Sequence, residues 1–260
     1  MHVRKDSGDM DKIVVENLTI RYSDGVESLF DINLRIPEKQ ITALIGPSGG
    51  GKSTFLRALN RLNDLADVDR VTGTIQIDEV DILNPGLDVI ALRRKVGIVF
   101  SRPLPLPLTI YQNVSYGLEL MGEKRKNVLD TAVERALRLA ELWDEVNDRL
   151  HDSAYSISGG QQQRLCLART LSLQPEIIML DEPTSALDPV STAKIETSLT
   201  ELKKDYTIII APHNTQQAGR IADHVAFFLQ GKLIEFSTAE EIFTNPKNIK
   251  TQDYISGKFG

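Results

Sequence analysis

The segment GPSGGGKST at residues 46–54 constrains the fold of this 260-residue chain more than any other stretch. The apolar run ITALI precedes it, and KSTFLRALNRL continues from it with apolar residues at helical spacing. A buried strand that passes through a glycine-rich loop into a helix is typical of parallel sheets, whose ligands bind beyond the carboxyl ends of the strands. We therefore expect an α/β fold with its main site at this loop.

The same segment fits the pattern G-x-x-x-x-G-K-[ST] in the strand-and-helix context that the pattern requires. Glycine tolerates positive φ, so successive backbone amides can curl around a phosphate. We expect Lys52 to bridge the β- and γ-phosphates and the Ser53 hydroxyl to ligate Mg²⁺. The alternative is a chance glycine-rich turn, which the flanking strand and helix disfavour. The candidate ATP-binding residues of the loop are Gly46, Pro47, Ser48, Gly49, Gly50, Gly51, Lys52, Ser53 and Thr54.

Two carboxylates end a second apolar run, IIMLDEP. A strand that ends in Asp181 places this side chain at the carboxyl edge of a parallel sheet, where it can hold Mg²⁺. Glu182 follows directly and is placed to orient and deprotonate an attacking water. Taken alone, Asp181 could cap the following turn and Glu182 could be solvated. Together with the glycine loop, the pair predicts a phosphate-transfer site.

Two further residues are candidates because of where they stand in the pattern. His213 ends the apolar run TIIIAPH, so we expect it at the same sheet edge as a γ-phosphate ligand. Tyr22 precedes the turn signal SDG and is a candidate stacking platform for adenine. A lone histidine or tyrosine at a strand end is often structural, and that interpretation stays open for both residues.

The stretch SISGGQQQRLCLART, which begins at Ser156, resembles a second phosphate receptor. It places small residues before a helix, and unpaired N–H groups point outward at a helix N-terminus. No acid, histidine or metal-binding pair lies in it. The chain thus carries two expected receptors for one nucleotide.

Composition narrows the class of protein. The apolar runs EIIML, TIIIAP and HVAFFL lack alternation, which is typical of strands covered on both faces. None approaches the ~20 apolar residues of a membrane span, and the first twelve residues lack the apolar core of a secretory signal, so we expect a soluble protein.

A net charge of −6 without a long basic run argues against a general nucleic-acid binder. Cys166 is the only cysteine, which excludes an internal disulfide and suits a reducing cytosol.

In this order, GPSGGGKS, ISGGQ, IIMLDEP, SALD and His213 resemble the motifs of the ATPase subunits of ABC transporters, over nearly the whole chain. The resemblance implies an α/β P-loop NTPase fold, the ABC-ATPase cassette. This fold has a RecA-like parallel-sheet core, an N-terminal antiparallel β subdomain and an inserted α-helical subdomain. It also implies a single ATPase domain at 11–260, with core segments 11–100 and 166–245, a helical subdomain at about 101–165 and a tail at 246–260.

The resemblance also explains the second phosphate receptor. It implies that two subunits stack head to tail, so that the signature residues of one chain cap the γ-phosphate of the ATP held by the other. The residues carried over for this role are Ser158, Gly159, Gly160 and Gln161, with Asp188 of SALD in the loop at the dimer contact.

The implied cofactors are ATP and Mg²⁺. The implied partners are a second copy of the chain, two membrane-spanning permease subunits and, indirectly, a periplasmic or extracellular solute-binding protein. Nucleic acid is not among them. The implied location is the cytoplasmic face of the cell membrane, with the chain as a peripheral subunit.

Within the family, NRLND, SGGQQQRLCLAR and the tail IFTNPKNIKTQDYISGKFG look similar to the phosphate-import ATPases of bacteria and archaea. Three positions depart from the family pattern. Ser101 stands where the family has a glutamine that serves the metal, Pro212 stands where a small residue or threonine is common, and Gly50 is a milder variation. Given the role of that glutamine in the family, the resemblance implies that the departure at Ser101 would alter the coupling between the metal site and the membrane subunit.

Alternatives from other classes remain open at this point. The stretch RPLPLPLTIY alternates proline with apolar residues, which favours a partner-binding segment over a stiff surface linker. The chain could energise another solute, or it could be a soluble ABC-type ATPase that acts on nucleic acid or ribosomes. A small-molecule P-loop kinase would leave ISGGQ and SALD unexplained.

Overall fold

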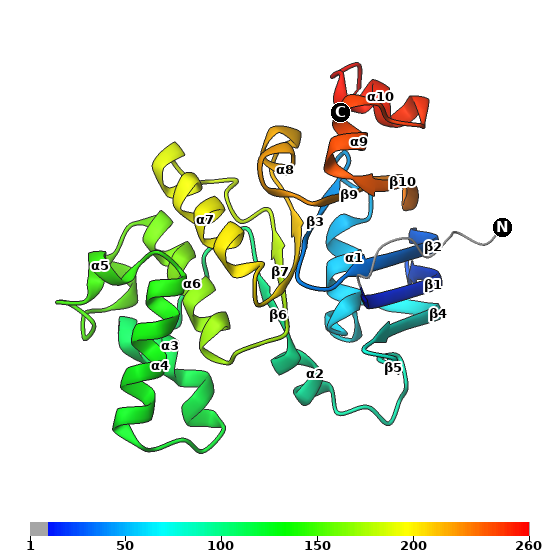
Figure 1. Ribbon diagram of the computed structural model, residues 1–260. Coiled ribbons are helices and arrows are strands. Elements are labelled where there is room, and N and C mark those ends of the chain that lie inside the picture. Colours follow the sequence, from blue (N-terminus) through cyan, green and yellow to red (C-terminus); the bar gives the residue numbers. More distant parts are fainter. Residues whose placement is uncertain (1–9, 260) are drawn as a thin grey trace.

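The computed structural model describes residues 10–259, which form two sheets with helices around them (Figure 1). Gly260, the last residue of the expected tail, lies outside the described residues, as do residues 1–9. The four-stranded sheet has the order β2–β1–β4–β5, and the six-stranded sheet has the order β10–β9–β3–β8–β7–β6. The first sheet consists of β1 (Asp11–Tyr22), β2 (Glu27–Pro37), β4 (Val68–Ile77) and β5 (Val80–Asp81). The second consists of β3 (Ile41–Ile45), β6 (Val96–Val99), β7 (Ile177–Asp181), β8 (Thr207–Ala211), β9 (His224–Leu229) and β10 (Lys232–Thr238).

The six-stranded sheet is parallel except for its β9–β10 pair, and both of its faces are covered. Successive residues along β8 pack into two different hydrophobic cores. Ile208 and Ile210 pack with the helices, whereas Ile209 and Ala211 pack toward the four-stranded sheet. Every side chain of such a strand is buried, which explains the apolar runs without alternation. The expected parallel-sheet α/β fold is confirmed.

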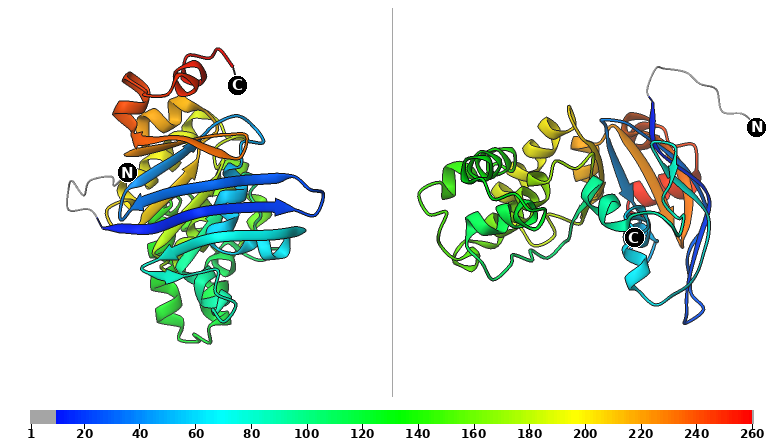
Figure 2. Two further views of the ribbon diagram at one scale, coloured as in Figure 1. Left: turned by 90° about the vertical axis from the view of Figure 1, so that its right-hand side faces the viewer. Right: turned by 90° about the horizontal axis from the view of Figure 1, so that it is seen from below.

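The four-stranded sheet is antiparallel and lies over α1 (Lys52–Leu59), as the two views of Figure 2 show. In β1, the buried residues Ile13, Val15, Leu18 and Ile20 join the same core as Phe55 of α1. Register shifts along β1 include one between Val15 and Leu18, which keeps both of these residues on the buried face. This sheet therefore holds the helix that follows the glycine loop.

Most of the helices lie on the opposite side of the six-stranded sheet. Figure 1 shows α3 to α6 gathered there, away from the four-stranded sheet. Over residues 10–259, no helix has both the length and the apolar character needed to cross a bilayer. The remaining α-helices are α2 (Val89–Lys95), α3 (Ile110–Leu120), α4 (Lys126–Leu139), α5 (Trp143–Val146), α6 (Gly159–Ser172), α7 (Pro189–Leu202), α8 (Thr215–Ile221), α9 (Ala239–Thr244) and α10 (Ile249–Ile255). Short 3₁₀ helices occur at Leu62–Leu65 and Ala154–Ser156.

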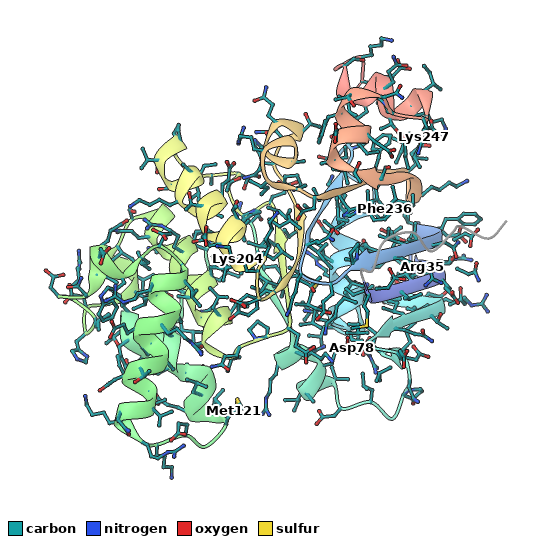
Figure 3. All side chains as sticks on the ribbon, viewed as in Figure 1. Arg35, Asp78, Met121, Lys204, Phe236 and Lys247 are labelled. Atoms are coloured by element: carbon teal, nitrogen blue, oxygen red, sulfur yellow. The ribbon has the colours of Figure 1, made fainter. Side chains whose placement is uncertain are left out.

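An ion-pair cluster joins the two sheets beneath α2. The buried ammonium of Lys12, at the start of β1, donates to Asp78 at 2.8 Å and to Glu176 at 2.5 Å. Lys95, which ends α2, contacts the same Asp78 carboxylate at 2.6 Å. Figure 3 labels Asp78 at this junction between the sheets and α2. Because the partners come from both sheets and from α2, the cluster restrains their relative positions.

Candidate nucleotide site

The predicted phosphate loop turns the chain from β3 into α1 through glycines with positive φ. These are Gly46 (140°), Gly49 (75°) and Gly51 (103°). A Cβ atom on Gly46 would lie 2.0 Å from the carbonyl oxygen of Phe228, and one on Gly51 would lie 2.7 Å from that of Ser28. Backbone atoms cannot rotate away as a side chain can. The loop therefore needs glycine at both positions for space as well as for φ.

Lys52 begins α1 and reaches back over the loop. Its ammonium donates to the carbonyl oxygens of Gly46 at 2.7 Å and Pro47 at 3.0 Å. Burial lowers the pKa of Lys52, and the nearby carboxylates of Glu182 and Asp181 oppose this shift. The cation is thus held by neutral acceptors, and a phosphate oxygen would be a stronger, charged acceptor at the same place.

The end of β7 brings the predicted carboxylates to this loop. The Ser53 hydroxyl donates to Oδ1 of Asp181 at 3.0 Å, which joins the first turn of α1 to the strand end. Glu182 follows with φ 48°, a left-handed conformation that is uncommon for a residue other than glycine. Its N–H donates to the carbonyl oxygen of Ala211 at 2.8 Å, which holds Glu182 beside the end of β8.

A pocket of about 180 Å³ opens where the phosphate loop meets the ends of β7 and β8. Lys52, Glu182 and His213 all line it, together with Tyr254 from α10. His213 is exposed, so its ring is accessible to a ligand in the pocket. Three elements that are far apart in the sequence therefore supply a cation, a carboxylate and an imidazole to one space.

Tyr22 ends β1 and lies beside the far end of the loop. Its hydroxyl is 3.4 Å from Oγ1 of Thr54, which also contacts the Ser28 hydroxyl at 2.7 Å. These contacts place Tyr22 next to the loop. Its role as an adenine platform remains a prediction.

The second expected receptor lies elsewhere. Ser158 is the N-cap of α6, its side chain accepts the Gln161 N–H, and the Gln161 side chain accepts the Ser158 N–H. A Cβ on Gly160 would lie 2.3 Å from Oγ of Ser191, so α6 packs closely against the start of α7. Of the described residues that line the Lys52 pocket, none belongs to 158–161. The two predicted receptors are therefore separate within one chain.

Asp188 connects the signature to the carboxylate strand. It caps α7 by accepting the N–H groups of Val190 and Ser191 and the Ser191 hydroxyl at 2.6 Å. The Ser191 hydroxyl is the main reason that the pKa of Asp188 is lowered. The segment between Glu182 and Asp188 thus runs from the nucleotide pocket to the packing contact of Gly160.

Ser101 lies two residues beyond β6, the edge strand next to β7. It is half-buried, and the residue before it, Phe100, accepts a hydrogen bond from the Gln163 amide of α6 at 2.7 Å. This contact ties the Ser101 loop to the signature helix.

Sequence reasoning did not single out two residues at this site, Tyr254 and Ser28. Tyr254 belongs to the C-terminal tail, whose sequence indicated only a resemblance to a family. Ser28 lies on the antiparallel strand β2, which contains no nucleotide-binding motif. The helical segment that carries Tyr254 has a detectable start signal, because Asn248 caps it by accepting the Lys250 N–H. That signal predicts a helix, but it does not predict that the helix lies beside the nucleotide pocket.

A parallel sheet with a glycine loop after one strand and a carboxylate at the end of another defines a protein of the P-loop nucleotide-binding class. Residues 29–185 match the family model described as ABC transporter, and the chain belongs to this family. The resemblance seen in the motifs is thereby confirmed.

Curated relatives match nearly the whole chain. One is phosphate import ATP-binding protein PstB 1 of Vibrio vulnificus (strain YJ016), 53% identical over 97% of this chain and 92% of its own length. Another is phosphate import ATP-binding protein PstB 2 of Bacillus licheniformis, 55% identical over 95% of this chain and 89% of its own length.

Solved structures share the fold. The structure of cbiO1 from Clostridium perfringens, part of the ABC transporter complex cbiONQ, has a TM-score of 0.80 and 30% identity, covering 95% of this chain and 96% of its own. The ATP-binding cassette MJ0796, solved as a dimer in a post-hydrolysis state with ADP and Pi, has a TM-score of 0.74 and 29% identity, covering 87% and 98%.

Proposed function

We propose that this chain is the ATP-hydrolysing subunit of an importer for inorganic phosphate. The observation that carries the ATPase part is the convergence of Lys52, Ser53, Asp181, Glu182 and His213 at one sheet edge. The geometry of this site bears on the nucleotide and not on the solute. Support for phosphate comes from the relatives, which are 53–55% identical and carry phosphate import in their names.

In this proposal, the backbone N–H groups of residues 48–51 surround the β-phosphate, and Lys52 turns from the loop carbonyls to the β- and γ-phosphates. Glu182 accepts the proton of the attacking water, because its carboxylate lines the pocket beside the loop. His213 lines the same pocket and donates to the γ-phosphate, stabilising the charge that develops there.

The residues also fit Mg²⁺, the proposed metal cofactor. The Ser53 hydroxyl and the Asp181 carboxylate lie 3.0 Å apart, and such oxygens are the ligands that Mg²⁺ prefers. Among the described residues, no group of three His, Cys, Asp or Glu side chains could hold a metal. Phosphate oxygens and waters would complete the shell, as is usual for Mg²⁺. When bound, the ion neutralises phosphate charge.

We propose that the signature residues 158–161 serve the nucleotide of a second copy of this chain. A Cβ on Gly159 would have open space around it, so a phosphate could approach the start of α6. A hollow of about 490 Å³ adjoins the nucleotide pocket, is lined by α7 and α8, and shares His213 with that pocket. This hollow supports the proposal that the reacting end of the nucleotide lies at an open face, which a second subunit would close.

The proposed contact with two membrane-spanning permease subunits is the segment from Ser101 to Tyr116 and the end of α3. Leu104, Tyr116, Leu120 and Met121 are exposed there, and Figure 3 labels Met121 at the tip of the helical side. Exposed apolar groups of this kind mark partner surfaces. Docking would hold the chain on the cytoplasmic face of the membrane as a peripheral subunit, with the solute-binding protein contacted only through the permease.

Replacing Glu182 by Gln tests the ATPase and dimer parts together. Glutamine keeps the size of the side chain but removes the base, so ATP should bind without being cleaved. We expect Glu182→Gln to elute as a dimer with ATP and Mg²⁺ and as a monomer without nucleotide in size-exclusion chromatography. A protein that stays monomeric under saturating ATP contradicts the dimer model for the isolated chain.

Uptake measurements test the solute. Cells that lack this chain should lose uptake of labelled phosphate while keeping uptake of sulfate, and the wild-type chain should restore it. The Glu182→Gln chain serves as the matched control, because it should dock without powering transport. Unchanged phosphate uptake in the deletion strain would exclude phosphate as the solute.

A further inference from the structure

A buried amide stands at the start of the helix that follows His213. Gln217 lies in the first turn of α8 and is only 1% exposed. Its backbone N–H donates to the side chain of Asn214, which caps this helix, at 2.9 Å. An amide side chain carries an acceptor oxygen and two N–H groups, and burying it is costly unless both ends find partners. The partners of Gln217 therefore show which parts of the chain it joins.

The two ends of the Gln217 amide contact different segments. Its oxygen accepts the buried hydroxyl of Thr184, two residues after Glu182, at 3.2 Å. Its nitrogen donates to the carboxylate of Glu196 on α7 at 3.1 Å. Figure 1 shows α7 and α8 as neighbouring helices. One buried side chain thus joins the segment that follows Glu182 to the helix that follows His213.

Glu196 fixes the direction of these hydrogen bonds. Its carboxylate accepts two bonds from the Arg220 guanidinium, at 2.6 and 3.0 Å. A carboxylate that is paired with a guanidinium can only accept, so the amide nitrogen of Gln217 must face Glu196. The amide oxygen then faces Thr184, whose hydroxyl donates to it. Each donor in this network meets an acceptor, from Thr184 to Arg220.

The network lies beside the groups that are proposed to cleave ATP. Thr184, Gln217 and His213 line the hollow of about 490 Å³, and His213 also lines the nucleotide pocket with Glu182. The carboxylate of Glu182 and the imidazole of His213 come from two separate segments. The Gln217 amide joins the continuations of these segments just outside the pocket.

We propose that Gln217 is a positioning residue for ATP hydrolysis, because its buried amide holds the segments of Glu182 and His213 in one arrangement. The inference rests on the roles proposed above for these two residues. The amide binds Thr184, a close neighbour of Glu182 in the sequence, so it acts on the geometry of the reaction rather than on the affinity for nucleotide. Displacing reacting groups by about 1 Å can slow a reaction by about 100-fold.

The first test is Gln217→Met, which keeps the length of the side chain and removes both hydrogen bonds. The matched control is Gln216→Met, at an exposed position of the same helix. The kcat, the dissociation constants of ATP and ADP, and the melting temperature are measured for both variants. We expect the kcat of Gln217→Met to fall by about 10- to 100-fold, with both dissociation constants within about 2-fold of wild type. Gln216→Met should match the wild type in all four.

A reciprocal exchange separates the hydrogen bonds from simple packing. Gln217→Glu places a second carboxylate where the wild-type amide nitrogen lies 3.1 Å from Glu196, so like charges repel and hydrolysis should fall. Adding Glu196→Gln supplies an amide that donates to the new carboxylate, to which Thr184 can still donate. Arg220, about half exposed, can keep a bond to the oxygen of that amide. We expect the double variant to turn over ATP at least about 5-fold faster than Gln217→Glu alone.

Dimer formation is measured separately, because Gln217 lines the hollow at which a second subunit is proposed to close. In the Glu182→Gln background, Gln217→Met should still elute as a dimer with ATP and Mg²⁺. Loss of this dimer would make Gln217 an interface residue and would overturn the positioning role.

Three other results would also overturn the inference. A lower melting temperature of Gln217→Met with an unchanged kcat would mean that the amide only stabilises the fold. Equal rates for Gln217→Glu and the double variant would mean that the direction of the hydrogen bonds is irrelevant. Weaker binding of both nucleotides in proportion to the lost rate would make the effect one of affinity.

Glu182→Gln separates failure of this inference from failure of the proposed function. If Glu182→Gln hydrolyses ATP at the wild-type rate, the proposed chemistry is wrong and the role of Gln217 fails with it. If Glu182→Gln is inactive while Gln217→Met keeps the wild-type rate, the proposed function stands and only the role of Gln217 is refuted.

Discussion

Replacing Glu145 by Gln removes one negative charge from a network beneath the signature helix and keeps the size of the side chain. Glu145, on α5, accepts two hydrogen bonds from the Arg164 guanidinium at 2.7 and 2.9 Å and one from the Gln161 amide at 2.9 Å. Lys194 of α7 donates to the same carboxylate. One side chain therefore links α5, α6 and α7.

The expected loss follows from the burial of the partners. The side chain of Arg164 is 3% exposed and that of Glu145 is 26% exposed. Breaking a buried ion pair costs about 3–5 kcal/mol. Here Arg164 keeps its bond to the Glu141 carbonyl, and the new amide oxygen can still accept one bond. We therefore expect a loss of about 2 kcal/mol, or a fall in melting temperature of about 4–8 °C for a chain of this size.

The pH dependence of this stability loss tests the contribution of the Glu145 charge more directly than its size at one pH. The hydrogen bonds from Arg164, with those from Lys194 and Gln161, lower the pKa of Glu145 from 4.5 to about 2. A depressed pKa in the folded state stabilises the fold above the unfolded value, and the effect disappears as pH falls through the folded value. The difference in melting temperature between wild type and Glu145→Gln should have its full value above about pH 4.5. It should decrease as the pH falls toward 2.

Glu134→Gln is the matched control. Glu134 pairs with Arg138 at 2.7 Å, but both side chains are about half exposed, so its removal should cost no more than about 0.5 kcal/mol. If Glu145→Gln loses no more stability than Glu134→Gln, or if its loss stays constant from neutral pH down to pH 3, the charge of Glu145 does not stabilise the fold as argued.

Two substitutions examine the signature and the metal-coupling position. Ser158→Arg places bulk and charge at the capped start of α6. Hydrolysis should therefore fall by about 100-fold, while the isolated chain keeps its ATP affinity. A large loss of that affinity would mean that the signature residues serve the nucleotide of their own chain. Ser101→Gln restores a longer amide beyond β6, so turnover should rise, most with the membrane subunits present, while ATP affinity stays within a few-fold. Unchanged or lower turnover would show that Ser101 itself supports the coupling between the metal site and the membrane subunits.

The sequence alone determined the parts of the site that consist of consecutive residues. The loop from Gly46 to Thr54 owes its shape to its own glycines and to the strand and helix on either side of it, so its local pattern suffices. The same holds for Asp181, because an apolar strand that is covered on both faces must end at the sheet edge. These local rules also gave the α/β class and the parallel core.

Which residues far apart in the sequence come into contact depends on how the whole chain packs. The pairing of Glu145 with Arg164, the packing of Gly160 against Ser191 and the position of Tyr254 beside the phosphate loop each join segments that no local pattern connects. Such contacts depend on how helices pack around the sheet, and packing is selected by the burial of the whole apolar surface rather than by any one segment. For that reason the tail sequence predicted a helix at most, while its place in the wall of the nucleotide pocket came from the fold.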